Sequence, residues 1–308
     1  MKKRIVVVVL LLCVILLIFF MPKKNTDEYI KDDSYTHIIG VSVPNITEPW
    51  IYDMIQVIED LKDKKYFDYN IILYESESNS QKQVEDIKTL YEYGMDVLVV
   101  VPDESEIVDN EISEIYKEIP VITVGNHCKG EYTCSIRYDD YKIGEMAAEY
   151  ILEEVYRANN DVFILTEENN FSRSEDIKRG FVDRAKDKID PDHMTFVDAS
   201  SLESIADSRM KEYLLLKEKP CVVFGFNDDM AYGAYKAARD WNVTGIKYVG
   251  VGCFKNKYEG DISYKRKVLS ASIELPHIGR TVMDTADKIL KKERIVDEII
   301  ADEFNIVK

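Results

Sequence analysis

Cys221-Val-Val-Phe-Gly-Phe-Asn-Asp-Asp-Met-Ala-Tyr-Gly-Ala-Tyr-Lys-Ala-Ala238 is the stretch that decides the expected fold. Its uninterrupted apolar run, Val222 to Phe226, is typical of a strand buried on both faces of a parallel sheet. Asn227 follows the run, and its side chain can accept a hydrogen bond from a free N–H group at a helix start. Apolar residues then recur at helical spacing, which predicts a helix packed back on the sheet. Asn227 is therefore expected at the carboxyl end of a parallel strand, where open α/β sheets place their ligand crevice.

The same alternation of apolar strands and amphipathic helices extends from residue 36 to the end of the chain. Strands are predicted at 38–43, 70–74, 97–101, 121–124, 162–165, 194–197, 222–226, 248–251, 269–273 and 299–307. Helices are predicted at 48–64, 81–93, 107–115, 139–156, 173–187, 202–216, 229–241 and 277–290. This order predicts an α/β fold built from right-handed βαβ units with parallel sheets. Because the pattern starts again at residue 139, we expect two similar lobes, and no linker rich in Pro, Gly or Ser separates them.

Several segments resemble, in order and spacing, the periplasmic sugar-binding proteins of the ribose type and the ligand cores of LacI-type repressors. They are Ile39-Gly-Val-Ser-Val-Pro-Asn-Ile-Thr-Glu-Pro-Trp50, Gln83 to Pro102, Ile119 to Val124, Arg179-Gly-Phe181, Asn227 to Ala234, Tyr248 to Gly252 and Ser270 to Ile273. The resemblance implies the type I periplasmic binding protein fold, with two Rossmann-like lobes, three crossovers and a ligand between the lobes. The first lobe would hold residues 36–126 plus 275–298, and the second would hold 127–274 plus 299–308.

The resemblance also implies a set of ligand-binding residues at the strand ends. They are Glu48, Trp50, Asn126, Asp139, Arg173, Asn227 and Glu274. Trp50 lies where the family has an aromatic ring that stacks on a sugar face. Asp139 begins a predicted helix, so capping of that helix explains the residue equally well.

The sequence departs from the family at three charged ligand positions. Gly125-Asn126 replaces an Asp-Arg pair, Gly252-Cys253 replaces an Asp, and Glu175 aligns with the family's ligand Arg by its spacing to Gly180. Hydrogen bonds to charged groups contribute about 1.5–3 kcal/mol each. We therefore expect simple pentoses and hexoses to bind more weakly than about 10 µM, near −7 kcal/mol. Another small polar ligand, or a structural role without a ligand, remains open.

The N-terminus combines Met1-Lys-Lys-Arg4 with an uncharged apolar run from Ile5 to Met21. This run is close to the minimum of about 17 residues needed to span a bilayer. We expect an uncleaved transmembrane anchor over residues 1–21, with the N-terminus in the cytoplasm and the rest of the chain outside. The alternatives are a cleaved secretory signal and a lipoprotein signal with Cys13 as acceptor. Residues 22–35 are polar and are expected to form a tether.

Charge and motifs exclude several classes of protein. A net charge of −17 disfavours binding to nucleic acid. The four histidines are scattered, and the sequence shows no nucleophile motif and no phosphate-binding glycine loop, so we expect no enzyme and no cofactor. His127-Cys128 lacks a second pair at metal-ligand spacing, so no metal site is expected. Cys128 and Cys134 flank a short loop, which is compatible with a disulfide bond or with two free thiols.

These observations predict a membrane-anchored, extracytoplasmic protein that binds a small sugar or a sugar-like molecule. The favoured role is sensing, with the closed form presented to a membrane partner such as a sensor histidine kinase. The alternatives are the substrate-binding component of an ABC transporter, delivering to a permease, and a scaffold that kept the fold without a ligand.

Overall fold

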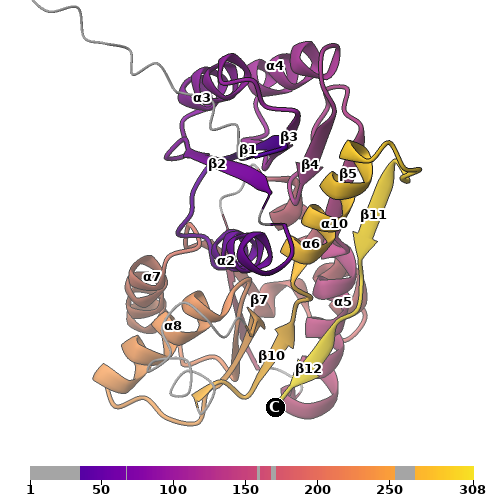
Figure 1. The fold of residues 1–308 in the computed structure, drawn as a ribbon. Helices are drawn as coiled ribbons and strands as arrows, with labels where there is room; N and C mark the ends of the chain where they lie inside the picture. Colours follow the sequence, from indigo (N-terminus) through magenta and orange to yellow (C-terminus); the bar gives the residue numbers. More distant parts are fainter. Residues whose placement is uncertain (1–34, 67, 158–159, 168–170, 254–267) are drawn as a thin grey trace, which may run out of the picture. The chain divides into compact units, whose positions relative to one another are not determined.

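The computed structural model describes residues 35–308 apart from residues 67, 158–159, 168–170 and 254–267 (Figure 1). The described residues belong to one compact unit, residues 35–308. The anchor predicted at residues 1–21 and the tether predicted at 22–35 lie outside the described residues, except for Tyr35. Among the described helices, none is long and apolar enough to cross a membrane.

The first lobe is built on a parallel sheet with the strand order β11-β5-β4-β3-β1-β2. Its strands are β1 (His37–Val43), β2 (Tyr69–Glu75), β3 (Val97–Val100), β4 (Val121–Val124), β5 (Cys134–Tyr138) and β11 (Glu298–Ala301). The helices α2 (Pro49–Lys64) and α10 (Ile278–Leu290) cover one face, and α3 (Ser80–Glu92) and α4 (Glu106–Tyr116) cover the other (Figure 1). Along β1, Ile39 and Val41 pack under α2, whereas Ile38 packs under α3, as expected for a strand buried on both faces.

The second lobe repeats this design with the strand order β12-β10-β9-β8-β6-β7. Its strands are β6 (Val162–Thr166), β7 (Met194–Asp198), β8 (Val222–Gly225), β9 (Lys247–Gly252), β10 (Ala271–Glu274) and β12 (Asn305–Val307), and only β12 is antiparallel to its neighbour. Helix α5 (Asp140–Tyr150), extended by the π-helical turn η1 (Ile151–Val155), packs on α6 (Ser172–Ala185). Helix α7 (Glu203–Leu216) packs on α8 (Asp228–Asp240), and the short 3₁₀ turn η2 (Pro191–His193) precedes β7.

The predicted α/β fold with two parallel-sheet lobes is confirmed, but the lobe boundaries differ from those expected. β5 and β11 pair with each other in the first sheet, although 127–274 and 299–308 were assigned to the second lobe. The sequence gives little sign of β5 because polar Ser135 and Arg137 interrupt its apolar residues. Arg137 remains accessible and pairs with Glu298 of β11, with 2.8 Å between Nη2 and Oε1.

The predicted start of α8 is confirmed in detail. β8 ends at Gly225, and Asn227 caps α8 because its Oδ1 accepts a hydrogen bond from the backbone N–H of Met230 at 2.8 Å. The next residue, Asp228, starts the helix and accepts a hydrogen bond from Ser272 of β10. The junction of strand and helix thus lies at the carboxyl end of the second sheet.

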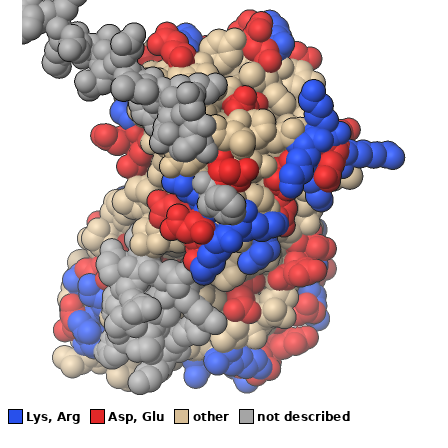
Figure 2. Space-filling model, in the orientation of Figure 1, with Lys and Arg blue, Asp and Glu red and all other residues tan. Residues whose placement is uncertain are grey.

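The surface carries charges of both signs. On the face shown in Figure 2, the Lys and Arg side chains of the described residues lie among Asp and Glu side chains and do not form one continuous basic surface. Together with the net charge of −17, this mixed surface is unsuited to a polyanion such as nucleic acid.

Candidate functional site

A cavity of about 220 Å³ lies where the carboxyl ends of strands from both sheets meet. Four of the residues predicted from the sequence line it: Glu48, Trp50, Asn126 and Arg173. The other lining residues are Pro44, Asn45, Ile51, Ser78, Glu167, Phe171, Ser200 and Ser201. Six of these eight lie within three residues after the end of β1, β2, β6 or β7, so the residues just after predicted strands were the sequence signal for them. A smaller neighbouring cavity is lined by Asn227, Val251 and Leu275, among others.

The close approach of α5 and α6 positions the charged residues of the site. A Cβ atom added to Gly144 would lie 2.0 Å from the carbonyl oxygen of Ile177, and one added to Gly180 would lie 2.0 Å from that of Tyr141. Only glycine allows this contact between the two helix backbones. It brings the first turns of the two helices together, with Asp140 on α5 and Arg173 on α6.

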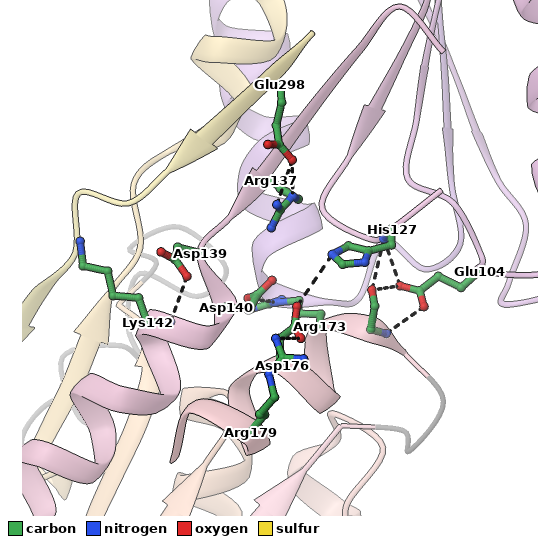
Figure 3. A network of polar contacts seen from close by, with 11 residues as sticks. Glu104, His127, Arg137, Asp139, Asp140, Lys142, Arg173, Asp176, Arg179 and Glu298 are labelled. Carbon is green, nitrogen blue, oxygen red and sulfur yellow. Dashed lines mark hydrogen bonds and ion pairs between the residues drawn. The ribbon is translucent and has the colours of Figure 1, made fainter. Parts of the chain in front are cut away.

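Arg173 is the centre of a buried charged cluster with Asp140 and Glu167, and Figure 3 shows its contact with Asp140. Its Nε donates to Asp140 Oδ1 at 2.9 Å, and its Nη1 lies 3.8 Å from Glu167 Oε1. The guanidinium also lies 5.4 Å from the Trp50 ring and 5.7 Å from the Tyr138 ring, which are cation–π distances. Nη1 is buried and has no hydrogen-bond partner among the described residues. Arg173 therefore brings to the cavity wall a buried donor whose hydrogen-bonding capacity is not used by the described residues.

Burial is the largest single influence on the pKa of each ionisable group in this cluster. It raises the pKa of Asp140 to about 7, although the charge and hydrogen bond of Arg173 act in the opposite direction. Burial likewise raises the pKa of Glu167, and Arg173 lowers it only in part. For Arg173, burial lowers the pKa, but the carboxylates of Glu167 and Asp140 outweigh this effect and the guanidinium stays charged. One cation thus serves two buried carboxyl groups.

Trp50 both lines the cavity and belongs to the hydrophobic core, since its side chain is 5% exposed. Its ring meets Tyr138 edge-on at 6.2 Å and lies directly over Gly125. A Cβ atom at Gly125, where φ is +74°, would lie 2.2 Å from Cη2 of Trp50. The indole therefore fills the space in which a larger residue at 125 would stand, which accounts for glycine in place of a charged residue at 125.

Two predicted amide ligands are already engaged by the protein. Asn126 lines the cavity and donates through Nδ2 to the Pro102 carbonyl at 2.9 Å. Asn227 lines the smaller cavity, donates to the Ser201 carbonyl at 3.2 Å and caps α8 through its oxygen. Both side chains therefore form hydrogen bonds to backbone groups near the strand ends, in addition to lining the cavities.

Asp139 and Glu274 line neither cavity. Asp139 caps α5, because its Oδ1 accepts a hydrogen bond from the N–H of Lys142 at 3.0 Å (Figure 3). Glu274 is the last residue of β10 and pairs in register with Asn305 of β12. The neighbouring Asp140, rather than Asp139, is the carboxylate that contacts Arg173.

Comparison with known proteins assigns the family. The family model described as "Periplasmic binding protein domain" matches residues 39–294. The chain belongs to the periplasmic binding protein family. Its members are binding proteins, which confirms the predicted resemblance and the prediction that the chain is not an enzyme.

Individual relatives cover most of this periplasmic binding protein. It is 26% identical over 268 residues to the ribose import binding protein RbsB of Bacillus subtilis, covering 85% of each chain. It is 26% identical over 265 residues to the transcriptional regulator RegA of Clostridium saccharobutylicum, covering 84% of this chain and 77% of the regulator. The solved structure of a fructose-binding periplasmic domain of a hybrid two-component system has a TM-score of 0.78 at 24% identity, covering 88% of this chain and 90% of that one.

The cysteines of this periplasmic binding protein correct one prediction. Cys128 and Cys134 are free thiols, so the disulfide bond considered for them is not formed. The two side chains pack on opposite faces of the first sheet, Cys134 in the core under α2 and Cys128 against the core under α3. The sheet itself therefore separates the sulfur atoms, and burial raises the pKa of both thiols, to about 12 for Cys128 and about 11 for Cys134.

Glu104 joins the two lobes at the edge of the cavity (Figure 3). Helix α6 has no side-chain cap of its own, since Phe171 occupies the N-cap position. Glu104, which follows β3 in the first lobe, accepts hydrogen bonds from the backbone N–H of Ser172 at 2.8 Å and from its hydroxyl group. Its carboxylate also accepts from the N–H of His127 at 3.2 Å. The first lobe thereby caps a helix of the second.

We expect Glu104→Ala to loosen the start of α6. Loss of a helix cap costs about 0.5–2 kcal/mol, so the free energy of unfolding should fall by that amount. Hydrogen exchange of the amides in the first turn of α6, followed by mass spectrometry, should become faster. Glu106→Ala is the control, because Glu106 is exposed and lies two residues away. Equal exchange in the two variants would show that Glu104 does not cap α6.

Proposed function

We propose that this chain is an extracytoplasmic solute-binding protein that encloses a small sugar or a sugar-like molecule in the cavity between its lobes. The observation that carries the proposal is the cavity itself, which is lined by strand ends of both lobes and by Arg173, whose Nη1 has no hydrogen-bond partner among the described residues. Its volume of about 220 Å³ is below the range of roughly 300–1,000 Å³ that is usual for drug-sized ligands. A molecule the size of a monosaccharide suits this space. Relatives named for ribose import support the same ligand class.

A ligand in this position would stabilise one arrangement of the lobes. Trp50 belongs to the first lobe and Arg173 to the second, so a molecule that contacts both residues favours the arrangement in which they approach each other. The stabilisation equals the difference in ligand affinity between the two arrangements. The arrangement of the lobes then reports the presence of the ligand to a partner.

For the role in the cell we favour sensing. The apolar run from Ile5 to Met21 would anchor the chain, since no small residues at cleavage spacing follow it, and Leu10-Leu11-Leu12 before Cys13 lacks the small residue that lipoprotein processing needs. The polar tether 22–35 would then keep the lobes close to a membrane partner such as a sensor histidine kinase. The similarity to the periplasmic domain of a hybrid two-component system fits this role in fold alone. The alternative is delivery to an ABC permease, which the ribose import relatives favour.

Tryptophan fluorescence offers a direct test of the site. The chain has two tryptophans, Trp50 in the cavity wall and Trp241 at the end of α8, where its side chain is 41% exposed. In a Trp241→Phe variant, ribose, fructose and myo-inositol should change the emission of Trp50, and we expect dissociation constants above about 10 µM.

Calorimetry on the same full-length chain distinguishes binding at another site from the absence of any sugar binding. Heat of binding without a change in Trp50 emission would place the ligand elsewhere on the molecule. No binding of any sugar at about 10 mM, an affinity weaker than roughly −3 kcal/mol, would instead favour a scaffold without a ligand.

A further inference from the structure

The charged groups around the cavity are unequal in number. Among the described residues that line it, Glu48 and Glu167 are acidic and Arg173 is basic. Arg173 is also shared with Asp140, which it contacts through a 2.9 Å hydrogen bond. Two buried carboxyl groups, Asp140 and Glu167, therefore depend on one guanidinium. A buried carboxylate without a full counter-charge is unfavourable, and within the described part of the chain this cluster has one positive charge fewer than it has carboxyl groups.

Glu167 is the member of the cluster whose carboxyl group has an ion pair but no hydrogen bond among the described residues. Its side chain is 10% exposed, and its carboxylate lies 3.8 Å from Nη1 of Arg173, beyond hydrogen-bond distance. No hydrogen bond to this carboxylate is found among the described residues. Glu167 and Arg173 both line the cavity, so a carboxylate and a guanidinium lie side by side in its wall.

Resting on the proposed function, we propose that the ligand is a sugar or polyol bearing a protonated primary amine. The ammonium group donates to Glu167 and supplies the missing positive charge. A neighbouring hydroxyl oxygen accepts from Arg173 Nη1. An anionic group on the ligand is disfavoured, because Glu48 and Glu167 both line the space around it.

Burial raises the pKa of Glu167, so the free protein disfavours the ionised carboxylate. A positively charged ligand would act in the opposite direction and lower this pKa. A ligand cation beside the carboxylate stabilises the charged form, and a charge-assisted hydrogen bond is stronger than a neutral one. A neutral sugar hydroxyl offers no such gain.

Matched ligand pairs test the proposal by calorimetry on the full-length chain. Glucosamine, galactosamine and mannosamine are compared with glucose, galactose and mannose, and with their N-acetylated forms, which lack the charge. We expect at least one amine to bind about tenfold or more tightly than its neutral counterpart, a difference of about 1.4 kcal/mol. Acetylation should remove this preference.

Two variants test whether the preference for an amine-bearing ligand depends on Glu167. Glu167→Gln keeps the shape of the side chain and removes its charge, so the ratio of amine affinity to neutral-sugar affinity should fall to about one. Glu175→Gln, at an exposed position of the same helix as Arg173, should retain the preference. The folding of both variants is checked by thermal unfolding, and Glu167→Gln should be no less stable than the parent because it removes an incompletely compensated buried charge.

The outcomes separate this inference from the proposed function. If neutral sugars bind in the cavity as tightly as the amines, the proposal that the ligand carries an amine is wrong. The proposed sugar-binding function would still hold. An amine preference that persists in Glu167→Gln would overturn the role of Glu167. Absence of binding by every amine and every neutral sugar would overturn both.

Discussion

Replacing Arg173 by methionine is expected to lower the free energy of unfolding by about 3–5 kcal/mol, because it leaves buried carboxyl groups without their cation. Asp140 would lose its 2.9 Å hydrogen bond, and Glu167 its neighbouring charge. Urea unfolding measures the difference. Arg179→Met is the matched control, since Arg179 lies on the same helix, is 62% exposed on its side chain and pairs with Asp176 at 2.7 Å. An exposed pair of this kind contributes at most about 1 kcal/mol.

The size of the Arg173→Met effect should depend on pH. Burial raises the pKa of Asp140 to about 7, and loss of Arg173 would raise it further. A carboxyl group whose pKa is higher in the folded than in the unfolded state favours folding at low pH, and this contribution is lost as the pH rises through the folded-state pKa. The deficit should therefore be larger at about pH 8 than at about pH 5.

A double variant shows whether the destabilisation by Arg173→Met comes from the lost positive charge or from the lost packing contacts of Arg173. Asp140→Leu combined with Arg173→Met removes both members of the hydrogen-bonded pair, and apolar replacement of a buried pair is often neutral or stabilising. We expect the double variant to be more stable than Arg173→Met alone. A double variant that is less stable than the single one would show that Arg173 contributes mainly through its contacts with Trp50 and Tyr138.

Gly180→Ala is expected to destabilise the second lobe by about 3 kcal/mol, the upper part of the usual range for overpacking. The added Cβ would lie 2.0 Å from the backbone oxygen of Tyr141, and a backbone atom cannot move aside alone. Helices α5 and α6 must then separate, which also separates Asp140 from Arg173. Alanine is the better helix former by about 1 kcal/mol, so any loss of stability arises despite the gain in helix propensity.

Chemical unfolding and ligand calorimetry together test the Gly180 prediction. Glu175→Ala, at an exposed position of the same helix, is the control and should change stability by less than about 0.5 kcal/mol. Gly144→Ala should resemble Gly180→Ala, because its Cβ would meet the Ile177 oxygen at the same 2.0 Å. Wild-type stability in Gly180→Ala would mean that the two helices can move apart without loss.

The sequence predicts those parts of the fold that depend on local patterns. The run from Val222 to Phe226 and the cap at Asn227 follow from adjacent residues, and the structure contains both. β5 is not predicted, because Ser135 and Arg137 interrupt its apolar residues, and the sequence does not show that Arg137 pairs with Glu298 of the edge strand β11. The crossovers between lobes were misplaced for the same reason.

The charged cluster shows why the contact between Asp140 and Arg173 could not be predicted from the sequence. Asp140 and Arg173 are distant in the chain, and they meet because Gly144 and Gly180 let two helices touch. Spacing to Gly180 pointed to Glu175, but a shift of two residues turns a side chain by about 200° around a helix. Glu175 is accordingly exposed, and Arg173 faces the cavity.

We expect the cap that Glu104 provides to α6 to affect the lifetime of the proposed bound state. In the proposed function a ligand leaves when the lobes part, and parting would break the hydrogen bonds from Ser172 to Glu104. Glu104 lines neither cavity. Changes at this position would therefore alter the dissociation rate and the residence time of the ligand, and with them the duration of any signal, while the choice of ligand stays with the residues of the cavity wall.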